Sequence, residues 1–390
     1  MTTYLTVKQK NTCYGCSACE QICPQKAISF APDEEGFLYP VLDENKCVSC
    51  GLCKLSCPYD NEKTDTEPFG VYAAQNKNKE ELLRSSSGGM FSVFAQEALS
   101  KGGVVVGCAF TEDLKAEHTV AFDKSGVDKM HGSKYVQSNM GDVYSQVKAI
   151  LEDGKNVFFT GTPCQVDGLK RYLRKPYDNL LTVDLVCHGV PSPALLEEYI
   201  SSTEKVNGQL QGLQFRNKAR NGWRSEGTLT FKNGKEKSFS PFRDSYYNLY
   251  YMKNCVSRIS CYSCKYASPS RVGDVTIGDF WNASDFLEEK AYKNGISVLL
   301  VNTQKGKRVF EDIRDKLFIY ETDIQTAQKG NGRLVKGGEI PQNRSSFYKK
   351  VKENGYEETV KQECKYTYLV PFIKRHIPQC LKKFVKKFLG

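Results

Sequence analysis

Two stretches near the amino terminus repeat one cysteine pattern. Both read C-x2-C-x2-C-x3-C-P, first as CYGCSACEQICP from Cys13 and then as CVSCGLCKLSCP from Cys47. Every cysteine of the second stretch follows its counterpart at the same spacing, so the segment is a duplicated half-site. Three thiolates in one short loop surround one face of a compact metal centre, and a fourth comes from elsewhere. The first sixty or so residues are therefore predicted to fold around metal.

The spacing predicts two 4Fe-4S clusters, because in this bacterial-type run the cysteine before the proline ligates the other cluster. Zinc knuckles and a disulfide framework are the alternatives, but zinc sites rarely use two such triplets followed by C-P. Residues 10 to 60 resemble the bacterial two-cluster ferredoxin module. The first quartet is predicted to be Cys13, Cys16, Cys19 and Cys57, and the second quartet Cys47, Cys50, Cys53 and Cys23.

The rest of the sequence predicts that the protein resides in a reducing compartment. The amino-terminal residues include no apolar core of signal-peptide length, and the longest apolar runs are far short of a membrane span. We therefore expect a cytoplasmic protein. In that setting the sixteen cysteines indicate metal binding or redox chemistry over disulfides.

The composition changes along the chain and predicts three parts. Residues 1–65 read as an α+β ferredoxin-like iron-sulfur module that ends in a polar linker, YDNEKTDTEP. Residues 66–340 alternate strands such as NVFFTG and LLTVDLVC with amphipathic helices such as PCQVDGLKRYL, and Ser192 is the expected N-cap of one helix. Antiparallel strands are expected in GLQFRN and GTLTFKNGKEKSFS, and two more core strands in DVTIGDFW and GISVLLVNT. This order predicts an α/β domain with a mixed, partly parallel sheet.

Residues 341–390 are predicted to form a basic, helical tail. The formal net charge is +10, and residues 365–390 hold seven Lys or Arg and no acid. In CLKKFVKKFLG, apolar residues recur at helical spacing opposite four lysines, which is typical either of a surface helix packed on its own domain or of peripheral membrane contact. No nucleic-acid-binding motif accompanies this charge, so no nucleic-acid partner is expected.

Four further cysteines fall where ligands bind in open α/β sheets. Cys164 and Cys187 each follow a predicted buried strand, at the edge where such sheets bind ligands, and CYSC supplies Cys261 and Cys264. From the residues alone, a third cluster, a zinc site and coincidence all stay open, and Cys255 is a rival fourth ligand. Cys108, Cys364 and Cys380 are expected to be structural.

The order of several motifs resembles a known family. The segments SSSGGMFSVF, GSKYVQS, GTPCQVDGLK, VCHGVPSP, CYSCKYA and IGDFW are similar to the family of the coenzyme F(420)-reducing hydrogenase beta chain, which includes the beta chains of formate dehydrogenase and 7-hydroxymethyl chlorophyll a reductase. The resemblance covers about residues 70 to 320. It implies FAD, a 4Fe-4S cluster beside it, and electron transfer between clusters and a hydride-type acceptor. By position, it makes Cys164, Cys187, Cys261 and Cys264 the ligands of that third cluster; we name these four residues the third quartet.

The same resemblance implies where the flavin binds. Glycines before a helix let backbone N–H groups approach a pyrophosphate, although an N-cap and a tight turn are the commoner meaning of SSSGG. Lys134 would supply a cation for phosphate or for the reduced flavin, and His188 a proton, although a lone His beside a ligand is more often structural. The dinucleotide fingerprints are absent. The candidate flavin-binding residues are Ser86, Ser87, Gly88, Gly89, Gly132, Ser133, Lys134, Tyr135, Ser138, Asp279 and Trp281.

These features predict an iron-sulfur flavoprotein oxidoreductase. Clusters pass single electrons, whereas an organic hydride acceptor takes two electrons with a proton, and a flavin converts between the two. The expected partners are a redox protein or ferredoxin-type donor and a small-molecule substrate, deazaflavin-like or other. The alternative is an electron-transfer subunit without its own substrate that serves a partner enzyme. The fused ferredoxin module departs from the family pattern, and no hydrogenase subunit or deazaflavin pocket is identified.

Overall fold

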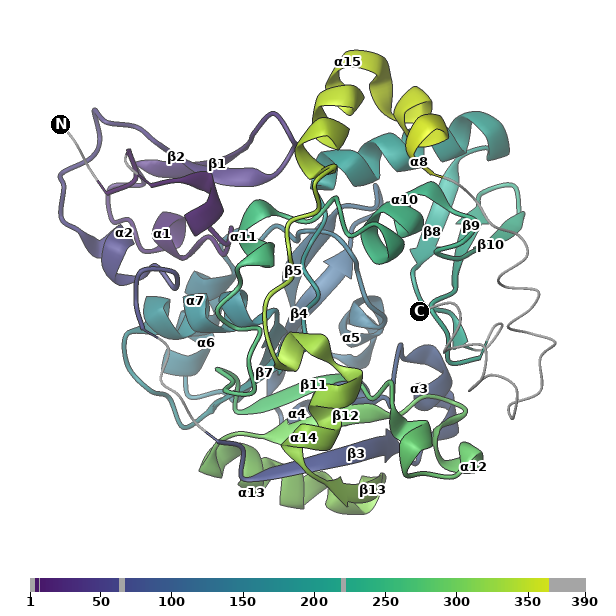
Figure 1. Cartoon of the computed structure of the whole chain (residues 1–390). Helices are drawn as coiled ribbons and strands as arrows, with labels where there is room; N and C mark the ends of the chain where they lie inside the picture. Colours follow the sequence, from purple (N-terminus) through teal and green to yellow (C-terminus); the bar gives the residue numbers. More distant parts are fainter. Residues whose placement is uncertain (1–3, 7, 63–66, 219–221, 365–390) are drawn as a thin grey trace.

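The computed structural model describes residues 4–6, 8–62, 67–218 and 222–364. Two units with their own sheets surround a large central sheet (Figure 1). The carboxy-terminal segment CLKKFVKKFLG, for which an amphipathic helix is predicted, lies outside the described residues, as do Cys380 and part of the predicted linker.

The central sheet has eight strands in the order β13-β3-β12-β11-β7-β6-β4-β5. The four neighbours β11, β7, β6 and β4 are parallel, and the remaining pairs are antiparallel. The sheet is therefore mixed and partly parallel, as predicted. The strands are β3 Gly70–Asn76, β4 Val104–Phe110, β5 Ala116–Ala121, β6 Val157–Gly161, β7 Leu180–Leu185, β11 Val275–Asp279, β12 Ser297–Val301 and β13 Leu317–Thr322.

Helices cover both faces of this sheet, because alternate residues of its buried strands point to opposite sides. Val105 packs with residues of α4, α5 and α13, whereas Val104 and Val106 pack with residues of α6 and α7. The helices are α3 Lys79–Arg84, α4 Met90–Ser100, α5 Lys124–Met130, α6 Val143–Glu152, α7 Pro163–Leu173, α12 Glu289–Tyr292, α13 Gln304–Ile313 and α14 Ile324–Gly330. Short 3-10 turns are η3 Ala283–Asp285, η4 Arg314–Lys316 and η5 Gly332–Leu334.

The amino-terminal module packs on the α6 and α7 side of the sheet. Its described residues form one antiparallel hairpin and three short helical turns. Cys16 and Ala18 belong to the same buried cluster as Val166 and Leu169 of α7, so the module shares a core with the main domain. Its elements are η1 Lys10–Thr12, α1 Ala18–Gln21, β1 Ile28–Pro32, β2 Leu38–Leu42 and α2 Leu52–Leu55.

A second core lies between a small antiparallel sheet, β10-β9-β8, and the helices around it. Ser192, the predicted N-cap, caps α8 by accepting a hydrogen bond from Leu195 N. Pro193 occupies the first helical position. Gly355 interrupts α15 with a φ of 77°. The elements are α8 Pro193–Asn207, β8 Leu210–Gln214, β9 Gly227–Phe231, β10 Glu236–Phe239, α10 Ser245–Tyr247, η2 Asn248–Met252, α11 Ile259–Tyr262 and α15 Arg344–Glu363.

Among the described residues, none of the helices is both long enough and apolar enough to span a membrane.

Candidate functional site

A cavity of about 670 Å³ opens where the parallel strands end. Gly161, Leu185 and Asp279, the last residues of β6, β7 and β11, all line it. The carboxyl edge of an open α/β sheet is where such folds bind ligands, and this volume suits a cofactor-sized molecule. The cavity is therefore the candidate functional site.

The third quartet lines one part of this cavity. A capping box between Thr162 and Gln165, with Pro163 in the first turn, starts α7 directly after β6 and sets Cys164 at the cavity wall. Cys187 follows β7 by two residues, Cys261 lies in α11, and Cys264 follows that helix. Three separate elements thus deliver four thiols to one place.

The thiols of the third quartet lie close enough to affect one another. Burial, and then the neighbouring Cys264, raises the pKa of Cys187 and of Cys164, to about 11 for Cys187. Burial, with Cys187 and Cys264 nearby, raises the pKa of Cys261 to about 12. Such thiols stay protonated at neutral pH unless a cation replaces the proton. A metal centre is such a cation, so the donor set fits a thiolate-ligated cluster.

Cys255, the rival fourth ligand, lies elsewhere. It is fully buried in the second core, where Cys364 is a neighbour, and it is absent from the cavity lining. The structure brings Cys164, and not Cys255, together with the other three cysteines.

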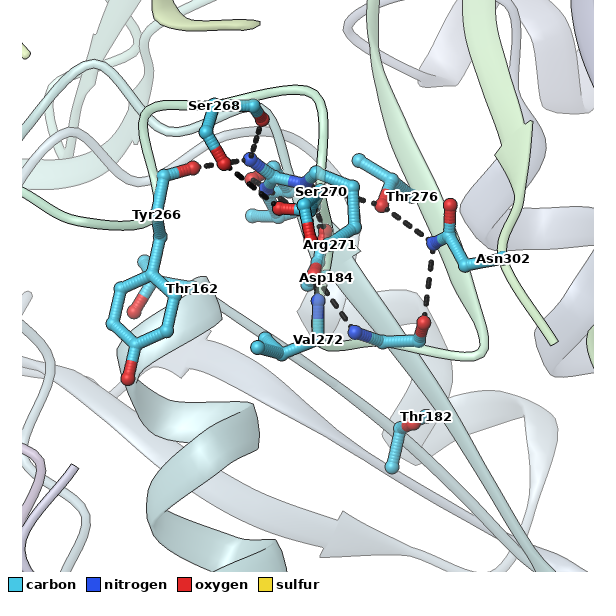
Figure 2. Close-up of polar contacts among 12 residues, drawn as sticks. Thr162, Thr182, Asp184, Tyr266, Ser268, Ser270, Arg271, Val272, Thr276 and Asn302 are labelled. Atoms are coloured by element: carbon cyan, nitrogen blue, oxygen red, sulfur yellow. Dashed lines mark hydrogen bonds and ion pairs between the residues drawn. The ribbon is translucent and has the colours of Figure 1, made fainter. Parts of the chain in front are cut away.

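A buried polar network fixes the loop that follows Cys264 (Figure 2). The Arg271 guanidinium donates to Asp184 Oδ1 at 2.9 Å and to the carbonyl oxygens of Tyr266 and Leu185. The other carboxylate oxygen of Asp184 accepts from the backbone N–H groups of Val272 and Gly273. Because Asp184 lies in β7, this network ties the Cys264 loop to the strand that leads to Cys187.

The two segments predicted to bind flavin meet on another wall. Ser86 Oγ accepts hydrogen bonds from Ser133 N at 2.9 Å and from Ser133 Oγ at 3.0 Å. Gly89, with a φ of 81°, is the N-cap of α4 and supplies no side-chain cap for the first N–H groups of this helix. Gly89, Met90 and Phe91, at the start of α4, line the cavity. Such a helix end favours an anionic group.

Ser87 and Gly88 also have packing roles. Ser87 Oγ donates to Ile296 O at 2.9 Å, and Gly88 N donates to Ser297 Oγ. A Cβ on Gly88 would lie 2.3 Å from Ala74 O, so only glycine fits there. The structure therefore shows Gly88 between two strands and not on the cavity wall.

Lys134, Tyr135 and Ser138 line the cavity, as does Gly132. The Lys134 ammonium donates to the carbonyls of Met130 and His131 at the end of α5, and burial lowers its pKa to about 8. Ser138 Oγ accepts from Gln165 Nε2 and is bonded to His118 Nδ1 at 3.0 Å. This buried network was missed by the sequence reasoning, because His118 stands in no motif and Gln165 was read only as a neighbour of Cys164.

Asp279 also lines the cavity. Its carboxylate accepts from Arg216 at 3.0 Å and from Trp223 Nε1 at 2.8 Å. Trp223 stacks on Trp281 with ring centroids 5.3 Å apart. Arg216 and Trp223 follow β8 in segments that carry no motif, so they were not predicted. Their pairing with Asp279 is visible only in the fold. His188 also lines the cavity, where burial and Arg333 lower its pKa.

The first quartet lines a smaller cavity inside the amino-terminal module. Burial and the nearby Cys57, Cys19 and Cys13 raise the pKa of Cys16 well above its usual value. Burial, with Cys50 and Cys47 nearby, also raises the pKa of Cys53. Cys50 itself is exposed. Cys23 is half-buried, and its sulphur accepts from Ala27 N at 3.4 Å. Within the described ranges no three side chains converge tightly enough for a single metal ion, and a four-iron cluster is larger than one ion.

Tyr14 lies between the two cavities and lines both. Its ring centroid is 5.5 Å from those of Tyr59 and Tyr266. Tyr266 in turn donates to Asp167 of α7 at 2.6 Å. The boundary between the module and the main domain is therefore a packed aromatic contact that joins the first quartet to the third.

Comparison with known proteins agrees with this architecture. A model of the 4Fe-4S dicluster domain matches residues 12–61, which defines the chain as an iron-sulfur protein. Models of the N-terminal and C-terminal parts of the coenzyme F420 hydrogenase/dehydrogenase beta subunit match residues 71–144 and 154–327. The chain belongs to this family, as the sequence motifs predicted.

Two relatives extend the comparison. One subunit of the F(420)H(2) dehydrogenase of Methanosarcina mazei is 22% identical over 379 residues, which span 92% of this chain and 97% of the relative. A chain of the F420-reducing [NiFe] hydrogenase complex from Methanosarcina barkeri aligns with a TM-score of 0.47 and 15% identity, over 75% of this chain and 96% of that one.

Proposed function

We propose that the protein is an iron-sulfur flavoprotein oxidoreductase that connects one-electron carriers to an organic hydride acceptor. The three cysteine quartets hold 4Fe-4S clusters, and the 670 Å³ cavity holds FAD beside the third quartet. One observation carries the proposal: four cysteines and the two predicted flavin segments, which are scattered from residue 86 to residue 264, line the same cavity.

Each group of residues has a distinct task in this proposal. The open end of α4 at Gly89 and the paired Ser86 and Ser133 bind the anionic part of the flavin. Asp279 and Trp281 also line this cavity. Flavins exchange both single electrons and hydrides, which is the chemistry this position requires. Lys134 and His188 are the candidate groups for holding charge and for moving a proton there.

The chain's own packing keeps the first and third quartets close together. Tyr14 fills the space between the first quartet and the third, and Cys16 lies next to the helix that bears Cys164. Cys50 of the second quartet is exposed to solvent. We infer that a redox partner approaches at this second quartet and that the substrate reaches the cavity of the main domain.

The second candidate function is an electron-transfer subunit without a substrate of its own. It is favoured by the name of the Methanosarcina mazei relative, which is one subunit of a dehydrogenase. That name, with the hydrogenase complex, also makes a deazaflavin such as coenzyme F420 the first acceptor to test.

The deciding experiment is anaerobic purification of the whole chain, followed by measurement of iron, acid-labile sulfide and released flavin. About twelve iron atoms and one FAD per chain support three clusters and a flavin. About eight iron atoms without flavin would overturn the flavoprotein proposal and leave the amino-terminal module. Turnover with a soluble deazaflavin or another acceptor by the isolated chain then separates the enzyme from the electron-transfer subunit.

A further inference from the structure

Arg258 is a fully buried arginine at the boundary between the amino-terminal module and the main domain. Its Nε donates to Cys13 O at 2.8 Å, and one terminal nitrogen donates to Leu38 O at 3.0 Å and to Gln137 Oε1 at 3.3 Å. The guanidinium carbon lies 3.8 Å from the ring centroid of Tyr39. The side chain therefore reaches from the main domain into the module.

No carboxylate of the described residues pairs with this guanidinium. The acids of the neighbouring module surface are engaged elsewhere: Asp33 by Lys10 at 2.9 Å, and Glu35 by Arg344 at 2.6 Å. The other terminal nitrogen of Arg258 is buried without a hydrogen-bond partner. Buried charges are normally paired, because an isolated ion in a protein interior costs several kcal/mol. Some other negative group must balance this cation.

The negative groups at hand are the thiolates of two quartets. Arg258 bonds the carbonyl of Cys13 in the first quartet, and it is the N-cap of α11, which carries Cys261 of the third quartet. Cys261 N donates to Arg258 O at 2.9 Å, and Ser260 Oγ donates to Cys13 O at 2.8 Å. The backbone of Arg258 thus contacts the third quartet, and its side chain contacts the first quartet.

We propose that Arg258 is a fixed counter-charge shared by the clusters of the first and third quartets. This inference rests on the proposed function, because it requires clusters at these quartets. Each one-electron reduction adds one negative charge to a cluster and moves no proton, and a nearby buried cation stabilises that added charge. Arg258 therefore raises the reduction potentials of both clusters relative to that of the cluster at the second quartet. It is a positioning residue, because it acts through its charge on the clusters.

The test is an EPR-monitored redox titration of the purified whole protein, with dithionite as reductant. Signals are assigned by their loss in Cys16→Ser, Cys164→Ser and Cys53→Ser proteins. In Arg258→Gln we expect the equilibrium constant for reduction at the first and third quartets to fall at least tenfold, which is about 59 mV for a one-electron couple. The second quartet should keep its potential, and Arg258→Lys should restore most of the loss.

Two variants separate charge from packing. Gln137→Glu is nearly isosteric and places a carboxylate on the same guanidinium nitrogen, so it neutralises Arg258 without removing it and should lower the same two potentials. Arg344→Gln breaks the ion pair with Glu35 at the same domain boundary and is the matched control, with no shift expected.

Unchanged potentials in both Arg258→Gln and Gln137→Glu, with full iron content, would overturn the proposal. If Arg258→Gln loses iron, the potentials of Gln137→Glu and Arg258→Lys test the proposal in its place. Loss of iron in Arg258→Lys as well would show that Arg258 has a structural role only. Absence of iron at the third quartet of the wild type is a different result. It would refute that part of the proposed function. The potential of the cluster at the first quartet would still test whether Arg258 acts as a counter-charge.

Discussion

Cys16 of the amino-terminal module packs directly against Gly168 of α7, one helical turn after Cys164. A methyl group built on Gly168 would lie 3.2 Å from Cys16 Sγ and 2.9 Å from Tyr144 Oη. Glycine is the only residue that allows this approach, although it weakens a helix interior relative to alanine. The contact brings the first and third quartets together, because both Cys164 and Gly168 stand on the same face of α7.

Replacing Gly168 with alanine is therefore expected to push the module away from α7. Overpacking costs about 1–3 kcal/mol, and the gain in helix propensity offsets up to about 1 kcal/mol of it. We expect a small loss of stability in thermal unfolding and a clear drop in the rate at which a soluble acceptor is reduced from the module.

Gly126→Ala is the matched control for this substitution. Gly126 lies in α5, and a Cβ there meets Ala121 Cβ at 2.8 Å, so it is also a crowded helical glycine. Its packing contact involves no cysteine quartet. Equal rates in both variants would show that the Cys16 contact has no part in electron transfer.

Iron content distinguishes the two candidates for the fourth ligand of the third quartet. Cys164→Ser is expected to lose about four of about twelve iron atoms per chain, because Cys164 lines the cavity with the other three thiols. Cys255→Ser is expected to keep full iron, since Cys255 packs in the second core. The reverse pattern in iron and sulfide assays would contradict the geometry described above.

Asp184→Asn should destabilise the protein strongly. It removes the charge that balances Arg271 in the ion pair drawn in Figure 2. The side chains of Asp184 and Arg271 are 0% and 1% exposed. A buried charge left without its partner costs about 3–5 kcal/mol. Chemical denaturation should show this loss, and iron of the third quartet should be released first, because the network holds the Cys264 loop. Glu357→Gln, which breaks an exposed ion pair with Lys205, should change little.

Lys134 predicts a specific dependence of stability on pH. Burial lowers its pKa from 10.5 to about 8, so between these values the unfolded chain binds a proton that the folded chain has lost. The free energy of unfolding attributable to Lys134 therefore rises with pH across this window, by up to about 3 kcal/mol. In protein freed of bound cofactor, the difference in stability between wild type and Lys134→Met should increase from about pH 8 upward. A flat difference would mean that Lys134 is not desolvated.

The sequence predicted the class of the protein because its strongest signals are local. The repeated C-x2-C-x2-C-x3-C-P run concentrates three ligands in one loop, and the dicluster family model matches the same segment. The alternation of strands and helices predicted the mixed sheet, and Ser192 predicted the start of a helix. Both features depend on residues that are neighbours along the chain. Order in sequence also placed Cys164 and Cys187 at strand ends.

Only the tertiary structure decided which distant residues meet. The packing of α11 placed Cys261 beside Cys187 and left Cys255 in the second core, a choice that spacing left open. The pairing of Asp279 with Arg216, and the buried charge of Arg258 beside Cys13, have no sequence signal, since each joins segments tens to hundreds of residues apart. The sequence by itself determined the ligand types and the local elements. Burial and long-range contacts, which depend on the whole chain, determined the environment in which those ligands work.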